Sequence, residues 1–300
     1  MNLASILTES AARDASHIAL KLDDALMTYG QLDAATALMA GVLAEKGISP
    51  GDRVGIMLPN VPYFAVCYYG VLRAGAVVVP MNVLLKRREV AFYLRDPGAK
   101  LLLAWNGFAA DAEGGAQDAG VECVLVEPGE FEQLLAAATP RADLADTGDT
   151  DTAVILYTSG TTGTPKGAEL THANLTRNCE IAASLFGVGG EAITLGALPL
   201  FHSFGQTCGL NATIRGGGTL TLIPRFDPGK ALGIIERDRV TVFEGVPTMY
   251  NAMLHHPEAS SFDTSTLVLC ASGGAAMPVE VMLLLCQGSV ANLCDLGVVM

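Results

Sequence analysis

Positive charge is scarce in this chain of 300 residues, where 18 Lys and Arg residues stand against 31 Asp and Glu residues for a formal net charge of −13. The one basic run is the short Lys86-Arg87-Arg88. A face basic enough to bind nucleic acid is therefore not expected, and no nucleic-acid partner is predicted. A protein of this charge that binds an anion must concentrate positive potential at one place.

Clustered cysteines are missing too. The seven cysteines are scattered and odd in number, and neither a CxxC spacing nor a nearby His accompanies Cys286 and Cys294. This pattern predicts neither a disulfide framework nor a metal site, so no residue is proposed as a metal ligand. We interpret the cysteines as reduced thiols of a cytoplasmic protein.

The sequence also lacks a recognisable leader and an uninterrupted apolar run long enough to cross a membrane. Charged residues begin at Glu9, which is too early for a signal peptide, and no basic segment precedes them. The longest apolar stretch, residues 64–85, carries Arg73 near its centre and is broken by Gly70 and Pro80. It predicts a buried helix followed by a strand.

What the chain does have is abundant apolar material in a regular alternation. Half of the residues are hydrophobic, and short β-branched runs alternate with helical segments of ten or more residues. This alternation predicts an α/β layer sandwich. Residues 27–32 are expected to open a helix that reaches about Glu45. Residues 127–152, with seven acidic side chains against the single Arg141, are the best linker candidate.

The most informative stretch runs from Ala153 to His172. An apolar run, Val154 to Tyr157, gives way to ten residues made almost wholly of Thr, Ser, Gly and Pro with one Lys. The pattern predicts a buried strand that enters a loop rich in backbone and hydroxyl donors, with Lys166 as a mobile positive charge. Such a loop is an anion cradle, and phosphate is the anion that glycine-rich donor loops most often hold.

Two other kinds of loop, a Walker A loop and an ordinary surface turn, can contain residues of these types. A Walker A loop is excluded because Gly163 follows Gly160 two residues too early and Pro165 precedes Lys166. An ordinary flexible surface turn remains the alternative. The residues predicted to hold phosphate are Thr158, Ser159, Gly160, Thr161, Thr162, Gly163, Thr164 and Lys166.

The stretch Tyr157–Gly167, YTSGTTGTPKG, resembles the signature loop of the adenylate-forming superfamily, and within it the fatty-acyl-CoA synthetases. The resemblance implies the layered αβαβα sandwich of that superfamily's N-terminal domain. It also implies that the loop holds the β- and γ-phosphates of ATP, bridged by Mg²⁺, while a carboxylate attacks the α-phosphate. Coenzyme A then attacks the acyl-adenylate to form a thioester. Lys166 is the first residue to which this resemblance assigns a catalytic role.

A second group of residues follows from the same resemblance. Pro199-Leu200-Phe201-His202, with Gly205 after it, is similar to the superfamily's second core motif, which places Phe201 and His202 beside the acyl carboxylate. From the residues alone, His202 could equally be a hydrogen-bonded core histidine. As a catalytic residue it would position the carboxylate rather than act as a base, because a carboxylate is already ionised at pH 7.

Two glycine turns complete the predicted site. Gly245 and Val246 would line the acyl tunnel, and Gly273, Gly274 and Ala275 would pack against both the acyl chain and the nucleotide, as the resemblance implies. Their plain alternative interpretation is that of strand-to-helix turns, which need glycine in any case.

The resemblance covers residues 1–278 and then stops. Residues 279–300 contain no Lys or Arg and lack the motifs expected next, so we interpret them as a divergent apolar tail. The expected fold is accordingly an incomplete N-terminal AMP-binding domain without the small C-terminal domain. We expect the isolated chain to be poorly soluble and weakly active at most, since a partial sandwich exposes apolar surface.

The leading hypothesis is a truncated acid–thiol ligase that uses ATP, Mg²⁺ and coenzyme A to activate a fatty acid. The alternatives are an acyl-AMP ligase or carrier-loading adenylation domain, and a catalytically dead ATP- or acyl-binding remnant. The predicted partners are small molecules, and a lipid substrate would allow peripheral membrane contact. The acyl chain length, the acceptor and the oligomeric state are left open.

Overall fold

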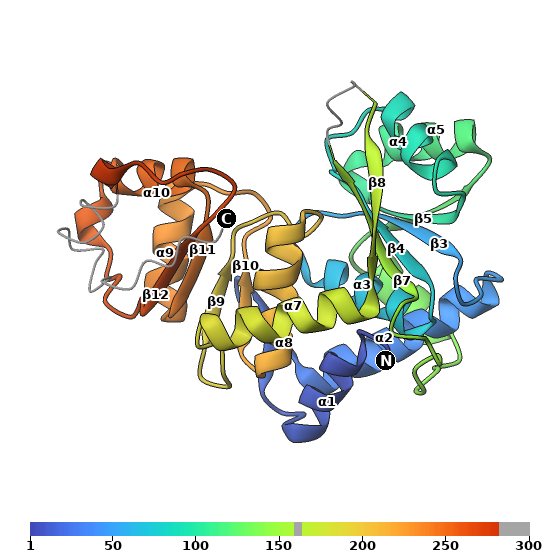
Figure 1. Ribbon diagram of the computed structural model, residues 1–300, viewed down its shortest axis with the longest axis horizontal. Coiled ribbons are helices and arrows are strands. Elements are labelled where there is room, and N and C mark those ends of the chain that lie inside the picture. Colours follow the sequence, from blue (N-terminus) through green and yellow to red (C-terminus); the bar gives the residue numbers. More distant parts are fainter. Residues whose placement is uncertain (159–163, 282–300) are drawn as a thin grey trace. The chain divides into compact units, whose positions relative to one another are not determined.

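The computed structural model describes residues 1–158 and 164–281 (Figure 1). The contacts within the chain divide it into two compact units. Unit 1 contains Met1–Ser16 and Tyr29–Asn178, and unit 2 contains His17–Thr28 and the chain from Cys179 onward. Each unit is built around its own six-stranded sheet.

The sheet of unit 1 has the strand order β6-β5-β3-β4-β7-β8. All neighbouring strands are parallel except β7 and β8, which form an antiparallel pair. Its strands are β3 (Arg53–Met57), β4 (Val77–Pro80), β5 (Ala99–Trp105), β6 (Glu122–Val126), β7 (Thr152–Thr158) and β8 (Lys166–Thr171).

The helices of unit 1 pack in two groups. Helices α4 and α5 pack together, and their Val90 and Ala112 join a core with Met57 and Leu102 of the sheet. Helix α2 packs against α3, which contacts β3 and β4. The helices are α1 (Ser5–Arg13), α2 (Tyr29–Glu45), α3 (Pro62–Arg73), α4 (Arg87–Arg95), α5 (Ala109–Ala119) and α6 (Glu130–Ala137), with a 3₁₀ turn at Asn106–Phe108.

The apolar stretch 64–85 folds as a buried helix followed by a strand, as predicted. The side chain of Arg73, the last residue of α3, is 2% exposed. Its guanidinium forms an ion pair with Asp33 of α2 and donates a hydrogen bond to the backbone oxygen of Ala142. Arg73 therefore ties α3 to α2 and to the segment after α6. No helix among the described residues has the length and apolar character needed to span a membrane.

Residues 127–152, for which the sequence predicts a linker, lie within unit 1. Helix α6 occupies their first half and buries Phe131 and Leu135. Beyond it, the amides of Arg141 and Ala145 donate to the backbone oxygens of Ala37 and Arg73 at 2.9 Å. The borders between the two units fall instead after residues 16, 28 and 178.

The sheet of unit 2 has the strand order β12-β11-β9-β10-β1-β2, and only the β1–β2 pair is antiparallel. Its strands are β1 (Ile18–Leu22), β2 (Ala25–Thr28), β9 (Ile193–Gly196), β10 (Thr219–Leu222), β11 (Val242–Gly245) and β12 (Leu269–Ser272). The helices are α7 (His172–Leu185), which begins in unit 1, then α8 (Ala212–Gly216), α9 (Pro228–Asp238) and α10 (Pro247–Leu254). Residues Gly205–Asn211 form a π-helix, labelled η2, and Ala259–Ser261 a 3₁₀ turn.

Opposite faces of this sheet carry different helices. Phe243 and Cys270 pack with Tyr250 and Met253 of α10 in one core. Ala271, the next residue along β12, packs with Cys208 of η2 and with residues of α7 and α8. Successive residues of a strand point to opposite faces, which explains this division.

The β1–β2 hairpin corrects one sequence-based expectation. Residues 25–28 form β2, so Met27 and Thr28 belong to a strand, and the helix expected to open over residues 27–32 begins at Tyr29. The strand forms because Ala25 and Leu26 pair with Leu22 and Lys21 across a tight turn. This pairing is a tertiary effect that a four-residue segment does not reveal by its periodicity.

The hairpin is attached to the rest of unit 2 through the buried carboxylate of Asp238. Lys21 forms an ion pair with it at 2.6 Å, Thr221 Oγ1 donates to it at 2.6 Å, and Arg237 Nε donates at 2.7 Å. Burial by itself would raise the pKa of Asp238, but hydrogen bonds from Arg237, Lys21 and Thr221 outweigh it and lower the pKa to about 2. The ionised form is therefore the form that stabilises the fold.

We predict that Asp238→Asn lowers the free energy of unfolding by about 2 kcal/mol at pH 7. Because the pKa is depressed in the folded state, this stabilisation is present above about pH 4 and is lost between pH 4 and pH 2. Urea unfolding at a series of pH values should show the two proteins converging over that range. Asp24→Asn, an exposed change in the turn of the β1–β2 hairpin, is the control and should have little effect. Parallel curves for wild type and Asp238→Asn would contradict the prediction.

Candidate functional site

The predicted phosphate loop closes the β7–β8 hairpin. Thr158 ends β7 and Lys166 begins β8, and the two residues face each other in the antiparallel register. Thr158, Thr164 and Lys166 are all exposed, so the ammonium group of Lys166 is available to an anion. Ser159, Gly160, Thr161, Thr162 and Gly163 lie outside the described residues.

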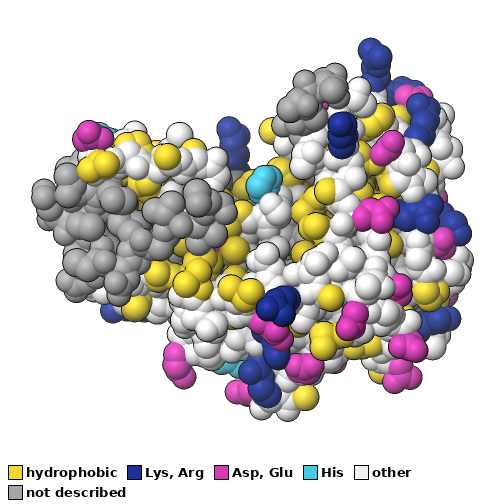
Figure 2. All heavy atoms as spheres, in the orientation of Figure 1, with side chains coloured by type: hydrophobic (Ala, Val, Ile, Leu, Met, Phe, Trp, Pro, Cys, Tyr) yellow, Lys and Arg dark blue, Asp and Glu magenta, His cyan; other side chains and the backbone are white. Residues whose placement is uncertain are grey.

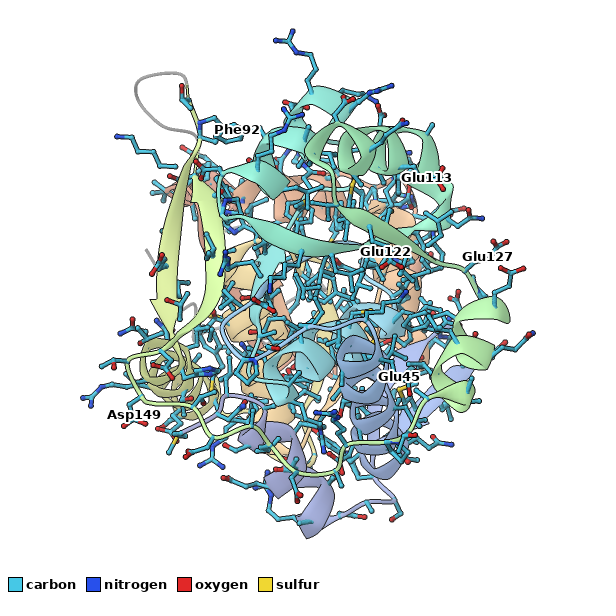
Figure 3. The ribbon with its side chains drawn as sticks, turned by 90° about the vertical axis from the view of Figure 1, so that its right-hand side faces the viewer. Glu45, Phe92, Glu113, Glu122, Glu127 and Asp149 are labelled. Atoms are coloured by element: carbon cyan, nitrogen blue, oxygen red, sulfur yellow. The ribbon has the colours of Figure 1, made fainter. Side chains whose placement is uncertain are left out.

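Aromatic side chains pack around Tyr157, next to the loop end of this hairpin. The Tyr157 hydroxyl donates to Asp96 at 2.5 Å, and its ring lies 4.3 Å from that of Tyr93 and 6.0 Å from that of Phe92, measured between centroids. Figure 3 shows Phe92 beside the hairpin, near the loop. Burial and the Asp96 carboxylate raise the pKa of Tyr157, so the phenol keeps its proton and the bond persists at neutral pH. The two ends of the loop are thus fixed by packing.

Helix α7 follows directly after the hairpin. The Asn174 amide donates to Thr171 Oγ1 at 3.1 Å, and the Thr171 amide donates to Asn174 Oδ1 at 3.3 Å. Two amides at the helix start are satisfied in this way, so Thr171 caps this helix.

A pocket of about 700 Å³ also opens in unit 1, but its charge does not suit a triphosphate. Asp96, Asp146, Asp151 and Glu169 contribute carboxylates to its lining, against the single guanidinium of Arg53. Neither Thr158, Thr164 nor Lys166 lines it. An anion would be repelled there, whereas the mouth of the hairpin presents a cation. Elsewhere on the face seen in Figure 2, acidic and basic side chains are interspersed.

The residues predicted to contact the acyl group come together at one edge of the unit 2 sheet. Strands β12, β11 and β9 are parallel neighbours, so their carboxyl ends lie side by side. Phe201 and His202 follow β9, Gly245 ends β11 and is followed by Val246, and Gly273 follows β12. In open α/β sheets, this edge is where ligands bind.

The glycine turns at this edge are explained by close approach and by backbone conformation. The Gly273 amide donates to the Gly245 oxygen at 3.2 Å, which joins the two turns. Gly274 has a φ of +77°, a conformation that glycine adopts without strain, and exposed Ala275 follows it. A Cβ at Gly205 would lie 2.5 Å from the Pro199 oxygen, so only glycine lets the chain after His202 fold back so tightly.

His202 is exposed, and its ring orientation can be described. The Phe204 amide donates to His202 Nδ1 at 3.4 Å. Since Nδ1 accepts, a neutral ring carries its proton on Nε2, which can donate to a carboxylate. The imidazole is thus arranged to orient an anionic group.

Two polar side chains that the sequence analysis did not select lie next to this edge. Glu244, one residue before Gly245, is 1% exposed, and its Oε1 atom has no hydrogen-bond partner in the described part of the chain. Gln206 of η2 is 0% exposed, and its Oε1 atom likewise has none there. A glutamate at the end of an apolar strand was the available signal, but the sequence alone does not show that it is buried.

A protein-built metal centre is not found among the described residues, where no three His, Cys, Asp or Glu side chains gather. The donors at the hairpin mouth are hydroxyls and an ammonium group. They suit phosphate rather than Mg²⁺, so we derive no step through a metal. No disulfide links the five described cysteines, Cys67, Cys123, Cys179, Cys208 and Cys270.

Comparison with known proteins shows the family that this chain resembles. The model of the AMP-binding enzyme family matches residues 7–292, beyond residue 278, where the sequence analysis ends the resemblance. A long-chain-fatty-acid–CoA ligase from Bacillus subtilis is 34% identical over 93% of this chain and 56% of its own length. A feruloyl-CoA synthase from an Amycolatopsis species is 39% identical over 85% of this chain and 50% of its own length. The chain spans about half the length of these relatives.

Solved structures of related proteins have a similar fold over most of this chain. The N-terminal domain of FACL13 from Mycobacterium tuberculosis, determined with an inhibitor, has a TM-score of 0.90 at 30% identity, over 98% of this chain and 74% of that one. ATP-bound MatB from Rhodopseudomonas palustris has a TM-score of 0.84 at 28% identity, over 95% of this chain and 57% of that one. The likeness confirms the predicted α/β fold of an adenylate-forming N-terminal domain. With the match along most of its length, this chain belongs to the AMP-binding enzyme family.

Proposed function

We propose that this chain contributes the nucleotide- and acid-binding part of an acid–CoA ligase. In the proposed reaction a carboxylate oxygen attacks the α-phosphorus of ATP, which gives an acyl-adenylate and pyrophosphate. The single observation that carries the proposal is the hairpin mouth, where Thr158 and Lys166 face each other across the ends of the phosphate loop. Family membership and the ATP-bound structural relative support the use of ATP.

The phosphate-binding role is assigned to Thr158–Lys166. A loop of this kind offers amide and hydroxyl donors, and the Lys166 ammonium supplies a charge that neutralises the leaving pyrophosphate. Because the chain has a formal charge of −13, an exposed lysine at the mouth of the loop supplies the local positive potential that attracts ATP. The proposed phosphate-binding residues include Ser159, Gly160, Thr161, Thr162 and Gly163.

The acid-binding role is assigned to the edge of the unit 2 sheet. His202 would donate from Nε2 to the substrate carboxylate and orient it, and no proton needs to be removed from the nucleophile. Phe201, Gly245, Val246 and Gly273 would line the acyl group, and Gly274 with Ala275 would border the nucleotide. The relatives act on different acids, a long-chain fatty acid and ferulate, as their names state. A fatty acid remains our first proposal, with coenzyme A as acceptor.

Two alternative functions remain. An acyl-AMP ligase or carrier-loading domain would make the same adenylate but pass it to another acceptor. Product analysis with coenzyme A and with a phosphopantetheinyl carrier separates these cases. A catalytically inactive remnant would bind nucleotide without releasing pyrophosphate. A cytoplasmic location, Mg²⁺ bound with the ATP phosphates, and peripheral membrane contact through a lipid substrate stay predictions.

The experiment that tests the proposal is ATP–pyrophosphate exchange by the purified chain with dodecanoate as the acid. We predict weak exchange that depends on the acid and that falls about a hundredfold in Lys166→Met. Lys230→Met removes an exposed lysine elsewhere and should leave the exchange rate unchanged. An exchange rate that depends neither on the acid nor on Lys166 would overturn the assignment. A rate like that of a full-length ligase would contradict the expectation of weak activity.

A further inference from the structure

The side chain of Glu244 lies between strand β11 and the π-helix η2. A Cβ built at Gly209 of η2 would meet the Oε2 atom of Glu244 at 3.5 Å. Beyond the backbone of its own helix and its chain neighbours, no other described atom comes within 4 Å of that position. Gly209 is itself buried, so the Glu244 carboxyl group lies beside the Cα of Gly209 inside unit 2. π-helical turns are rare and occur frequently at functional sites.

The polar atoms in this region are incompletely satisfied. Glu244 Oε1 has no hydrogen-bond partner among the described residues, and neither does Gln206 Oε1. The Gln206 amide nitrogen donates only a long bond, 3.4 Å, to the Leu200 oxygen. Buried polar groups are almost always paired, and a group left unpaired destabilises the fold. Two such groups on adjoining elements offer hydrogen-bonding positions to a polar ligand.

The position of the pair relates it to the acyl group. Glu244 immediately precedes Gly245 and Val246, and Gln206 lies four residues after His202. The backbone amide of Gln206 donates to the His202 backbone oxygen at 2.9 Å. The start of η2 is therefore hydrogen-bonded to the residue that is proposed to hold the carboxylate. A substrate held by its carboxylate at His202 would direct its acyl part past Gly245 toward this region.

Resting on the proposed function, we infer that Glu244 and Gln206 form a polar subsite that selects acids bearing a hydroxyl group on the acyl part. Burial raises the pKa of Glu244 to about 8, so at pH 7 most of the carboxyl groups are protonated and can both donate and accept. A substrate hydroxyl has the same two capacities and satisfies an acid and an amide together. An unsubstituted chain would leave the polar atoms unpaired, and sites built to hydrogen-bond a hydroxyl discriminate strongly against analogues that lack it.

The experiment compares matched acids on the full chain by equilibrium binding in the presence of ATP. The pairs are 12-hydroxydodecanoate with dodecanoate, and 4-hydroxycinnamate with cinnamate. In at least one pair the hydroxylated acid should bind about tenfold more tightly or better. Glu244→Leu should reduce that ratio to about one, and Glu244→Gln should retain part of it. Glu191→Gln, an exposed change in unit 2, should leave it unchanged.

The outcomes separate this inference from the proposed function. If the acids bind but neither pair shows a preference for the hydroxyl, the subsite is wrong and the proposed function stands. A preference that survives Glu244→Leu also overturns the subsite. If neither ATP nor any of the acids binds, the proposed function fails and the subsite fails with it. Thermal melts of each variant establish that the protein tested is folded.

Discussion

Replacing Glu244 with Gln is expected to raise the free energy of unfolding at pH 9 by up to about 5 kcal/mol, the largest change that we predict for any substitution. Burial raises the pKa of this carboxyl group from the ordinary 4.5 to about 8. Ionisation therefore costs more in the folded than in the unfolded chain. Stability is unaffected below about pH 4 and falls as the pH rises from 4 to 8. An amide of similar shape has no proton to lose, so the variant should not show this decline.

Within residues 1–158 and 164–281, no cation offsets the charge of Glu244. The titratable groups whose charges interact with it are Cys208 of η2 and Tyr250 of α10. Burial, followed by the Glu244 charge, raises the pKa of Cys208 to about 12, and burial raises that of Tyr250 as well. Both stay neutral up to pH 9. Urea unfolding from pH 4 to pH 9 should show the two proteins diverging, with Glu191→Gln following wild type. Identical pH profiles would show that Glu244 is solvated or paired.

The second large effect is expected at Asp33. Asp33→Ala removes the ion-pair partner of Arg73, whose side chain is almost wholly buried. We predict a loss of about 3 kcal/mol of unfolding free energy, because the guanidinium remains buried with a backbone oxygen as its remaining partner. Arg73→Met should cost less, because it removes the charge itself and leaves an apolar chain in an apolar site.

Urea unfolding at pH 7 measures both Asp33→Ala and Arg73→Met. Asp118→Ala is the matched control, because it breaks a pair with Arg87 that is exposed on both sides and should cost much less than Asp33→Ala. If Asp33→Ala cost no more than Asp118→Ala, the Arg73 pair would be solvated rather than buried.

The sequence predicts the strands better than their assembly. Mainly apolar runs such as Val77–Pro80 and Ala99–Trp105 fold as strands because burial on both faces of a parallel sheet requires continuous apolar residues. Nothing in the segment 18–22 indicates that it pairs with residues 219–222, since that partner is chosen by tertiary packing. β2 was missed for the same reason, and η2 because Gly205 and Gly209 interrupt its periodicity.

The candidate site is predicted in a similarly uneven way. The loop and the sheet-edge turns carry unusual glycine and hydroxyl patterns, so Thr158, Lys166, Gly245 and Gly273 could be selected from sequence. Glu244 could not be selected from sequence, because its proposed role depends on its burial beside Gly209. Local chemistry is visible in a sequence, whereas the burial of a single polar side chain depends on elements far apart in the chain.

The measurement that bears most directly on the triphosphate-binding loop is equilibrium binding of ATP, AMP and adenosine to the full chain and to Lys166→Met. If the loop holds the β- and γ-phosphates, wild type should bind ATP at least about tenfold more tightly than AMP. Lys166→Met should lose most of that difference, while Lys230→Met keeps it. Equal affinities for the three ligands, or an ATP preference that does not depend on Lys166, would contradict the assignment of this loop.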